Sequence, residues 1–309
     1  MSDTGLLVIG DVVTDVVALH GSPVMAGTDT AAEIVLRPGG SGANTAAWAA
    51  HLGADSRLLA KLGYDSSEWH TTELVRTGVR PHVPVDQEHP TAVVIAMVDK
   101  TGERSMLTNR GAGGLISDAD WDPSLLDGVG RLHLSGYTLF AAPGLRLARA
   151  AVRDAVAAGV PVSIDPASTG PLRDFGVERF MRETSAADLI IPNLDEALVL
   201  TGVPAPERAA VLLSETYGTA VVKLGAEGAL VAVDGKVTAT CAGVSAEVVD
   251  STGAGDAFAA GYLTATLQGA DAALALEAGC RAGAQCVAQV GGRPRYGLDL
   301  NRLYPIHTD

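Results

Sequence analysis

The chain has 309 residues, and its 22 Lys and Arg against 36 Asp and Glu give a formal net charge of −14. Apolar residues make up 47% and charged residues only 19%, which allows a large buried core and excludes wholesale disorder. The negative balance and the absence of a Lys- or Arg-rich run exclude a protein whose main task is to bind a nucleic acid backbone.

Cysteine usage and the start of the chain narrow the class of protein further. Cys241, Cys280 and Cys286 are odd in number and form no CxxC pair, which argues against a disulfide framework or a zinc site. Residues 1–5 contain no basic region of the kind that begins a signal peptide. No window reaches the roughly 18 apolar residues that a membrane span needs. We therefore expect a cytoplasmic protein with no membrane partner.

In chain order, the first element is a strand at residues 6–10, which is apolar on both faces like a strand buried in a parallel sheet. Later apolar segments have the same character: 131–134, 160–164, 189–191, 220–224 and 228–233. Helical patterns lie between or after these strands: 43–52, 145–158, 194–201, 254–268 and 271–290. Because strands alternate with helices, the sequence predicts an α/β fold around a mostly parallel sheet.

Two stretches, at about 12–37 and 91–110, interrupt this alternation. They contain strand-like pieces with no helix between them, at 12–19, 33–36, 91–98 and 104–109. The turn at 99–102 joins the last two pieces into a predicted β-hairpin. We expect the two stretches to form a small separate sheet, either a lid or an oligomer surface, on a single domain of residues 1–309.

A second kind of signal comes from glycine-rich segments, of which the first in the chain is PGGSGANTA at 38–46, ahead of a helix. Three glycines in four residues let a ligand approach the backbone, and Asn44 offers an amide that donates and accepts hydrogen bonds. A dinucleotide-binding fingerprint does not fit, because the first strand leads into DVVTD at 11–15 instead of a glycine turn. No Walker A motif occurs either.

The strongest chemical signal is DSTGAGDAFAAG at 250–261, which follows a strand-like stretch at 246–249 and opens a helix. Its glycines leave backbone N–H groups pointing outward, and the positive end of the helix adds to them, so the segment forms an anion cradle. Asp256 lies in the first helical turn, where an acid can cap the helix or can accept a proton from a nucleophile that attacks phosphorus. At a helix N-terminus its pKa is expected to be low.

Weaker signals lie elsewhere in the chain. Asp15 is a lone acid in an apolar strand, residues 193–196 follow a buried strand, and residues 223–228 place two glycines after a strand end. Each pattern also has a plain structural explanation: an exposed strand residue, a helix cap and a turn. No group of His, Cys, Asp and Glu has the spacing of metal ligands.

Taken together, these motifs resemble the ribokinase family, the PfkB group of carbohydrate and nucleoside kinases. Residues 39–44 resemble the family's N-terminal glycine signature, 250–256 resemble its D-[ST]-x-G-A-G-D signature, and 193–196 match its N-x-x-E motif. The three occur in the family's order, and the resemblance covers essentially the whole chain. It implies a three-layer α/β/α ribokinase-like fold with a small β-sheet lid, and ATP-dependent phosphorylation of a primary alcohol.

The resemblance also implies a role for particular residues. Asp256 would be the catalytic base, beside an anion hole formed by the backbone of Gly253, Ala254 and Gly255. The substrate would be bound by Asp15, Gly40, Ser41, Asn44 and Ser135. ATP would lie along Asn193, Lys223, Gly225, Gly228 and Cys280, although Cys280 and Cys286 are also expected in a helix core. Mg²⁺ would be held through water by Asn193 and Glu196, and K⁺ by Asp250, Thr252, Val287 and Gly292.

At some positions the residue type differs from that in ribokinase proper, so the sequence leaves the identity of the substrate open. Val13, Ser41 and Ser135 stand where that enzyme carries Asn, Lys and an acid, so contacts to ribose are lost while the phosphoryl-transfer motifs stay intact. The leading hypothesis is a sugar kinase. A nucleoside kinase is the alternative, with an apolar wall of Val13, Met97 and Met106. A non-catalytic sensor of a sugar or nucleotide is the third reading.

The small sheet also bears on assembly. A sheet of about four short strands is marginal on its own, so it should pack on the domain or pair with a second copy. Because the resembling proteins pair in this way, we expect a homodimer through the lid. The other expected partner is a small-molecule sugar or nucleoside.

Overall fold

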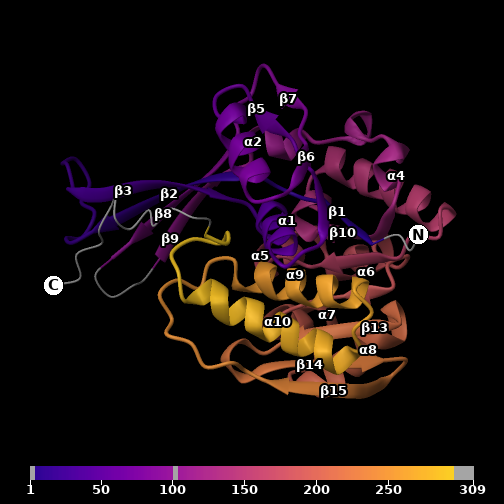
Figure 1. Ribbon diagram of the computed structural model, residues 1–309. Coiled ribbons are helices and arrows are strands. Elements are labelled where there is room, and N and C mark those ends of the chain that lie inside the picture. Colours follow the sequence, from indigo (N-terminus) through magenta and orange to yellow (C-terminus); the bar gives the residue numbers. More distant parts are fainter. Residues whose placement is uncertain (1–3, 100–103, 296–309) are drawn as a thin grey trace.

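The computed structural model describes residues 4–99 and 104–295, in which a nine-stranded sheet forms the main body (Figure 1). Its strands are β1 (Gly5–Ile9), β4 (Asp55–Leu59), β6 (Arg80–His82), β10 (Val129–Ser135), β11 (Val162–Asp165), β12 (Leu189–Ile190), β13 (Thr219–Lys223), β14 (Gly228–Val233) and β15 (Lys236–Ala242). Their order is β15-β14-β13-β12-β11-β10-β1-β4-β6. Neighbours from β6 to β13 are parallel, whereas β13 with β14 and β14 with β15 pair antiparallel, so the predicted mostly parallel sheet is confirmed.

Helices cover both faces of this sheet. They are α1 (Ser41–His51), α2 (Ser67–Arg76), α3 (Gly136–Leu139), α4 (Ala142–Ala157), α5 (Thr169–Phe175), α6 (Val177–Glu183), α7 (Leu194–Thr201), α8 (Pro206–Tyr217), α9 (Ala254–Leu267) and α10 (Ala272–Val287). Alternation along β1 sends Leu7 and Ile9 into one core with α4, α7 and α8. Leu6 and Val8 enter the other core with α1, α9 and α10, which confirms the three-layer arrangement.

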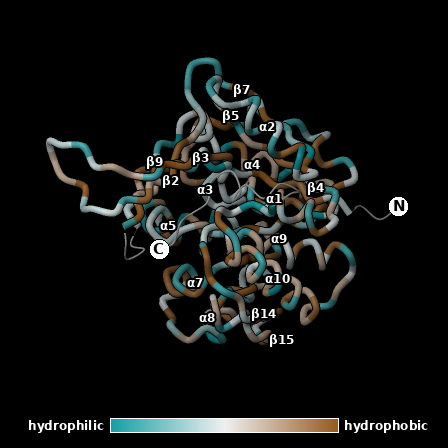
Figure 2. The backbone as a smooth tube through the Cα atoms, turned by 60° about the vertical axis from the view of Figure 1, so that its left-hand side comes forward, coloured by the Kyte–Doolittle hydropathy of each residue, from teal (hydrophilic) through white to brown (hydrophobic). Residues whose placement is uncertain are grey.

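A small separate sheet projects from the side of this body, as both views show (Figure 1, Figure 2). Its strands are β2 (Val13–His20), β3 (Ala32–Gly39), β8 (Ala92–Val98) and β9 (Arg104–Asn109), in the order β3-β2-β8-β9. These strands come from the two stretches that interrupt the strand–helix alternation of the sequence. Residues 100–102 of the predicted turn lie outside the described residues. Whether the sheet acts as a lid stays a prediction.

The sequence patterns missed elements whose residues are not consistently apolar. The predicted elements omit β4, which begins with Asp55, Ser56 and Arg57, and the edge strand β15, in which exposed residues alternate with partly buried ones. They also omit β6, α2, α5, α6 and α8. The strand-like stretch at 246–249 is a wrong prediction. It lies beyond the edge strand β15, pairs with no neighbour in the described sheet, and leaves Val248 69% exposed.

Several helices serve mainly to complete the two cores. Helix α10 buries Cys280 and Cys286 in the core that it shares with α9, as the sequence predicts. Within residues 4–99 and 104–295, no single helix is long and apolar enough to cross a membrane, and α7 and α8 meet that criterion only as a bent pair. Both of these helices contribute buried side chains to the core.

Candidate active site

Two cavities meet at the carboxyl end of the central strands. One cavity, of about 830 Å³, lies between the end of β13, the start of β14 and helix α10. It is called the α10 cavity below. The other, of about 620 Å³, lies beneath the small sheet and is called the small-sheet cavity. Four residues line both cavities: Ser41, Ala167, Gly253 and Asp256. A molecule in one cavity can therefore reach a molecule in the other at this junction.

The glycine loop before α9 forms one wall of the junction. Gly253 has a φ of 75°, in the left-handed region that favours glycine, and a Cβ there would lie 2.5 Å from the Gly292 Cα atom. The N–H groups of the first turn of a helix have no carbonyl partner one turn earlier. The backbone of Gly253, Ala254 and Gly255 lines the α10 cavity at this point, although Ala254 N also donates to the Ser251 carbonyl over 3.3 Å. The anion hole stays a prediction.

Asp256 lies at the centre of the junction and is held from the opposite side by α1. Ser41 Oγ donates to its Oδ1 over 2.7 Å, and Asn44 Nδ2 donates to its Oδ2 over 2.9 Å. Desolvation raises the pKa of Asp256 to about 7, and these two hydrogen bonds only partly oppose the rise. The low pKa predicted from the helix N-terminus is therefore wrong, because burial outweighs the helix dipole.

The predicted substrate residues do not all reach the small-sheet cavity. Asp15, Gly40, Ser41 and Asn44 line it, whereas Ser135 does not. Ser135 is 1% exposed, and its hydroxyl has no hydrogen-bond partner within the described part of the chain. The placement of Ser135 on the substrate is therefore not borne out by its position, because the end of β10 is covered.

The apolar wall predicted for a nucleoside is also only partly present. Val13 and Met106 line the small-sheet cavity, but Met97 does not. Alternate residues of a strand face opposite sides of a sheet, and Val94, which lines the cavity, lies an odd number of positions from Met97. Met97 consequently belongs to the outer face.

Further polar groups of the small-sheet cavity were missed in the sequence. They include Asp11 and Tyr137. Burial raises the pKa of Asp11 even though its Oδ1 accepts a hydrogen bond from Gly42 N over 3.1 Å. Burial, and next the charge of Asp11, raises the pKa of Asp15 to about 6. The signal that could have found Asp11 is its place two residues beyond the end of β1, since functional groups gather where parallel strands end.

The α10 cavity is lined by all the predicted nucleotide residues, which are Asn193, Lys223, Gly225, Gly228 and Cys280. Glu196, predicted to hold Mg²⁺, lines it as well. Asn193 and Glu196 form a capping box on α7, in which Asn193 Oδ1 accepts from Glu196 N over 2.9 Å and Glu196 Oε2 accepts from Asn193 N over 2.8 Å. Burial, and next the charge of Asp165, raises the pKa of Glu196 to about 7. Amide and carboxylate oxygens at a cavity wall fit Mg²⁺ held through water.

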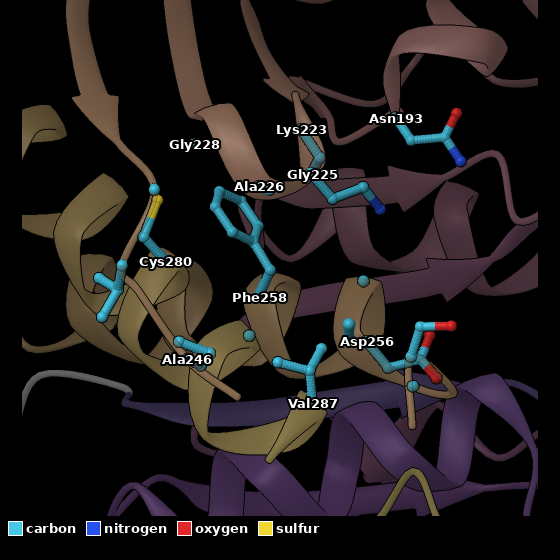
Figure 3. Close-up of a pocket in the computed structure, with 18 of the residues that line it drawn as sticks. Asn193, Lys223, Gly225, Ala226, Gly228, Ala246, Asp256, Phe258, Cys280 and Val287 are labelled. Carbon is cyan, nitrogen blue, oxygen red and sulfur yellow. The ribbon is translucent and has the colours of Figure 1, made fainter. Parts of the chain in front are cut away.

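A buried ion pair that the sequence analysis missed lies in the same cavity. Lys223 Nζ donates to Asp165 Oδ2 over 2.5 Å, and the two side chains are 11% and 9% exposed. Burial lowers the pKa of Lys223, but the charges of Asp165 and Glu196 outweigh it and keep that pKa above its ordinary value. Figure 3 shows the polar ends of Lys223 and Asn193 directed into this cavity, across from Asp256. Asp165 could have been found as the last residue of a strand.

The residues predicted to hold K⁺ lie together beside the glycine loop. Asp250 Oδ1 accepts from Thr252 N and Thr252 Oγ1, and its Oδ2 accepts from Gly291 N over 2.9 Å. The Val287 carbonyl accepts from Val249 N, and the Gly292 carbonyl accepts from Trp48 Nε1 over 2.9 Å. Such oxygens are the ligands a hard cation takes, but each already accepts an internal hydrogen bond. The K⁺ site stays a prediction that depends on their remaining lone pairs.

Gly292 joins the two glycine-rich segments. A Cβ on Gly292 would lie 2.5 Å from Asn44 Nδ2, so the residue is wedged between Asn44 and Gly253. The next residue, Arg293, is buried and donates from Nη2 to the Gly39 carbonyl over 2.9 Å. The turn after α10 therefore fixes the distance between the segment at 38–46 and the segment at 250–261.

Comparisons with known proteins agree with this geometry. A family model described as "pfkB family carbohydrate kinase" matches residues 3–295. An ATP-dependent ribose-1-phosphate kinase from Halopiger xanaduensis is 31% identical over 266 residues, which cover 82% of each chain. A fructokinase from Escherichia coli is 33% identical over 235 residues, or 74% of this chain and 76% of that one. The crystal structure of adenosine kinase from Sinorhizobium meliloti matches with a TM-score of 0.85 and 26% identity, over 94% and 95% of the two chains.

Proposed function

The chain belongs to the pfkB family of carbohydrate kinases, as the resemblance of its motifs predicted, and from this premise we propose how it acts. It is an ATP-dependent kinase that phosphorylates a hydroxyl group of a sugar or nucleoside. The observation that supports the arrangement is the junction of the two cavities at Asp256. ATP occupies the α10 cavity, the acceptor occupies the small-sheet cavity, and the hydroxymethyl group of the acceptor meets the γ-phosphate beside this carboxylate.

Asp256 acts as the general base. An alcohol has a pKa far above 7, so the oxygen needs a nearby acceptor for its proton as the bond to phosphorus forms. A carboxylate whose pKa is raised to about 7 is a stronger base than one at its ordinary value, and it is still ionised at slightly alkaline pH. Ser41 and Asn44 fix both of its oxygens, which keeps the carboxylate aimed at the junction.

The groups around the γ-phosphate neutralise negative charge. The backbone N–H groups of Gly253, Ala254 and Gly255 form the anion hole at the start of α9. Asn193 and Glu196 hold Mg²⁺ through water, and when bound the ion screens the charge of the phosphates. Lys223, Gly225, Gly228 and Cys280 line the rest of the nucleotide path. K⁺ beside Asp250 and Thr252 would orient the same loop.

The acceptor is held by Asp15, Gly40, Ser41 and Asn44, of which the last two also hold Asp256. A sugar is the leading substrate class because carboxylate and amide groups dominate this end of the cavity. A nucleoside is the alternative, supported by Val13, Met106 and Tyr137 on the cavity wall. A non-catalytic sensor is the least supported reading, since Asp256 and all three residues of the anion hole are present.

An ATP-consumption screen tests the proposed function. Neutral sugars, sugar phosphates, sugar acids and nucleosides would be offered with Mg²⁺ and ATP to the wild-type protein and to Asp256→Asn. We expect acceptor-dependent consumption in the wild type and its loss in the variant. Acceptor binding without consumption in either protein would overturn the kinase assignment in favour of the sensor.

We also propose a cytoplasmic homodimer that pairs through the small sheet. Cross-strand registers place Leu36, Val16, Ile95 and Leu107 in one row on the face opposite Asp15. Leu36 is 61% exposed and Leu107 is 60% exposed, which is unusual for aligned large apolar side chains. Burial of this row against a second copy would remove it from water.

A further inference from the structure

Each carboxylate oxygen of Asp165 has a hydrogen-bonding partner, one in the α10 cavity and one at the junction. It is the last residue of β11 and lies next to Ser135 at the end of β10. Its Oδ2 accepts from Lys223 Nζ over 2.5 Å, and its Oδ1 accepts from Ala167 N over 2.8 Å. The side chain therefore connects a lysine of the α10 cavity with a turn that borders both cavities.

The lysine amine lies beside the anion hole. A Cβ on Gly255 would lie 3.3 Å from Lys223 Nζ, so the amine reaches the first turn of α9. On its other side, Lys223 N donates to the Pro192 carbonyl and its backbone bridges to Asn193. The positive charge consequently lies between Asn193 of the proposed metal-binding pair and Gly255 of the proposed anion hole. Figure 3 shows Lys223 between Asn193 and Asp256.

The turn held by the other oxygen is strained. Ala167 has a φ of 74°, which is one of two left-handed conformations at non-glycine residues among those described. Such a conformation persists where the surroundings fix it, and it gathers at functional sites. Because Ala167 lines both cavities, the hydrogen bond from its N–H to Asp165 fixes the boundary between them.

We propose that Asp165 is a positioning residue, which holds the Lys223 amine against the transferring phosphoryl group and fixes the Ala167 turn between the cavities. This inference rests on the proposed kinase function. Lys223 would be a catalytic residue, because its charge would contact the oxygens of the γ-phosphate as negative charge grows on them. Asp165 acts by positioning Lys223.

The charges around the Lys223 amine explain why it needs Asp165 as a partner. Three carboxylates compete for the Lys223 amine, namely Asp165, Glu196 and Asp256. Without Asp165, the amine would swing towards Asp256 and form an ion pair with the base. The charged and titratable groups that face Asp256 from other elements are Asp165, Lys223, Tyr137 and Cys286. Of these, Asp165 raises the pKa of Asp256 and Lys223 lowers it, so the loss of the Asp165 charge lowers that pKa.

The test begins with Asp165→Asn, which keeps an oxygen for Ala167 N but removes the charge. We expect kcat to fall about 10²-fold, the usual scale for losing one aligned charge or donor at a transition state. The acid limb of the kcat/KM profile should move to lower pH, because the base then ionises more easily. Unchanged kcat together with an unmoved acid limb would overturn the proposal.

A double variant, Asp165→Asn with Lys223→Met, separates positioning from folding. The single variant removes the closest partner of the buried Lys223 amine and is expected to lower Tm, whereas the double variant removes both charges and should regain Tm. If the pair only stabilises the fold, the double variant regains wild-type kcat, which contradicts the proposal. If Lys223 contacts the phosphoryl group, the double variant folds well and stays about 10²-fold slow.

Calorimetry with Mg²⁺-ATP gives a readout that needs no turnover. Lys223→Met should weaken ATP binding about tenfold, and Asp165→Asn should weaken it by less because the amine is present but misdirected. A wild-type protein that binds ATP but phosphorylates no acceptor would overturn the kinase function alone. Equal ATP affinity in all three proteins would count against the contact between Lys223 and the phosphates.

Discussion

The cavity junction and the outer face of the small sheet differ in what surrounds their key side chains. At and beside the junction, Asp256, Asp165 and Lys223 are largely buried, and each has a polar partner within 3 Å. On the outer face, Leu36 and Leu107 are mostly exposed and contact mainly their strand neighbours. The first region is complete within one chain, whereas the second would be completed by a second chain. Substitutions should therefore affect chemistry in one region and assembly in the other.

The largest effect is expected for Asp256→Asn. The variant keeps the shape, and α9 has no side-chain capping hydrogen bond to lose, but the variant cannot accept the proton of the alcohol. We expect kcat to fall about 10²–10⁴-fold, the usual scale for removal of a general base, while ATP affinity changes little. Turnover and calorimetry on the folded variant measure both. Retention of more than about a tenth of wild-type kcat would argue against the assignment of the base.

Gly292→Ala should come next, because it acts on the same carboxylate from a distance. A Cβ would lie 2.5 Å from Asn44 Nδ2 and would push that amide away from Asp256. A displacement of about 1 Å near a reacting group can lower kcat about 10²-fold. Gly170→Ala is the matched control, since a Cβ there has nothing within 4 Å and should leave kcat unchanged. Equal kcat in the two variants would contradict the wedge role of Gly292.

The raised pKa of Asp256 predicts opposite pH trends for activity and stability. Activity should fall as pH drops through about 7, because the base becomes protonated. Stability should instead fall as pH rises from about 4 to 7, because a carboxyl group with a raised pKa in the folded state favours folding only when it is protonated.

Asp256→Asn removes the coupling between protonation of this carboxylate and folding. A comparison of the variant with the wild type therefore measures that coupling. At pH 8 the variant should be more stable than the wild type by about 1–3 kcal/mol, and the difference should shrink towards pH 4. Thermal unfolding of both proteins across this range checks the sign. A wild type that gains stability relative to the variant as pH rises would show that the pKa of Asp256 is lowered.

The smallest effect on catalysis is expected for a substitution on the outer face of the small sheet. Leu36→Glu should dissociate the proposed homodimer, because a carboxylate would be buried in an apolar interface. Light scattering should then report half the mass, and kcat should change by less than about twofold. Val156→Glu, an equally exposed apolar position on α4, is the control and should leave the mass unchanged. A monomeric wild type at micromolar concentration would remove the proposed interface.

Much of this architecture could be predicted because its signals are local. The central strands are apolar on both faces, so their runs stand out from the flanking helices. The glycine segments are recognisable because their backbones need conformations and close approaches that side chains would block, as at Gly253. These segments also contain predicted site residues, and those residues line the two cavities.

What could not be predicted depends on long-range packing. The pKa of Asp256 follows from its burial by α1 and β11, which no local pattern reveals. Asp165 and Asp11 stand at or just beyond strand ends with no motif around them, and their partners lie tens of residues away. Ser135 and Met97 were misplaced because a sequence does not show which side of a strand end is covered.

The wedge at Gly292 has a consequence for how the protein is made. During synthesis the ribosome releases the 38–46 segment early, but the residues that clamp it, Gly292 and Arg293, follow only after every strand of both sheets. Every strand of both sheets precedes residue 243, so the sheets can form while the centre is still open. A chain halted before residue 291 would therefore hold all its strands and no assembled centre. The cell therefore obtains a working catalyst only after residues 291–293 have been released.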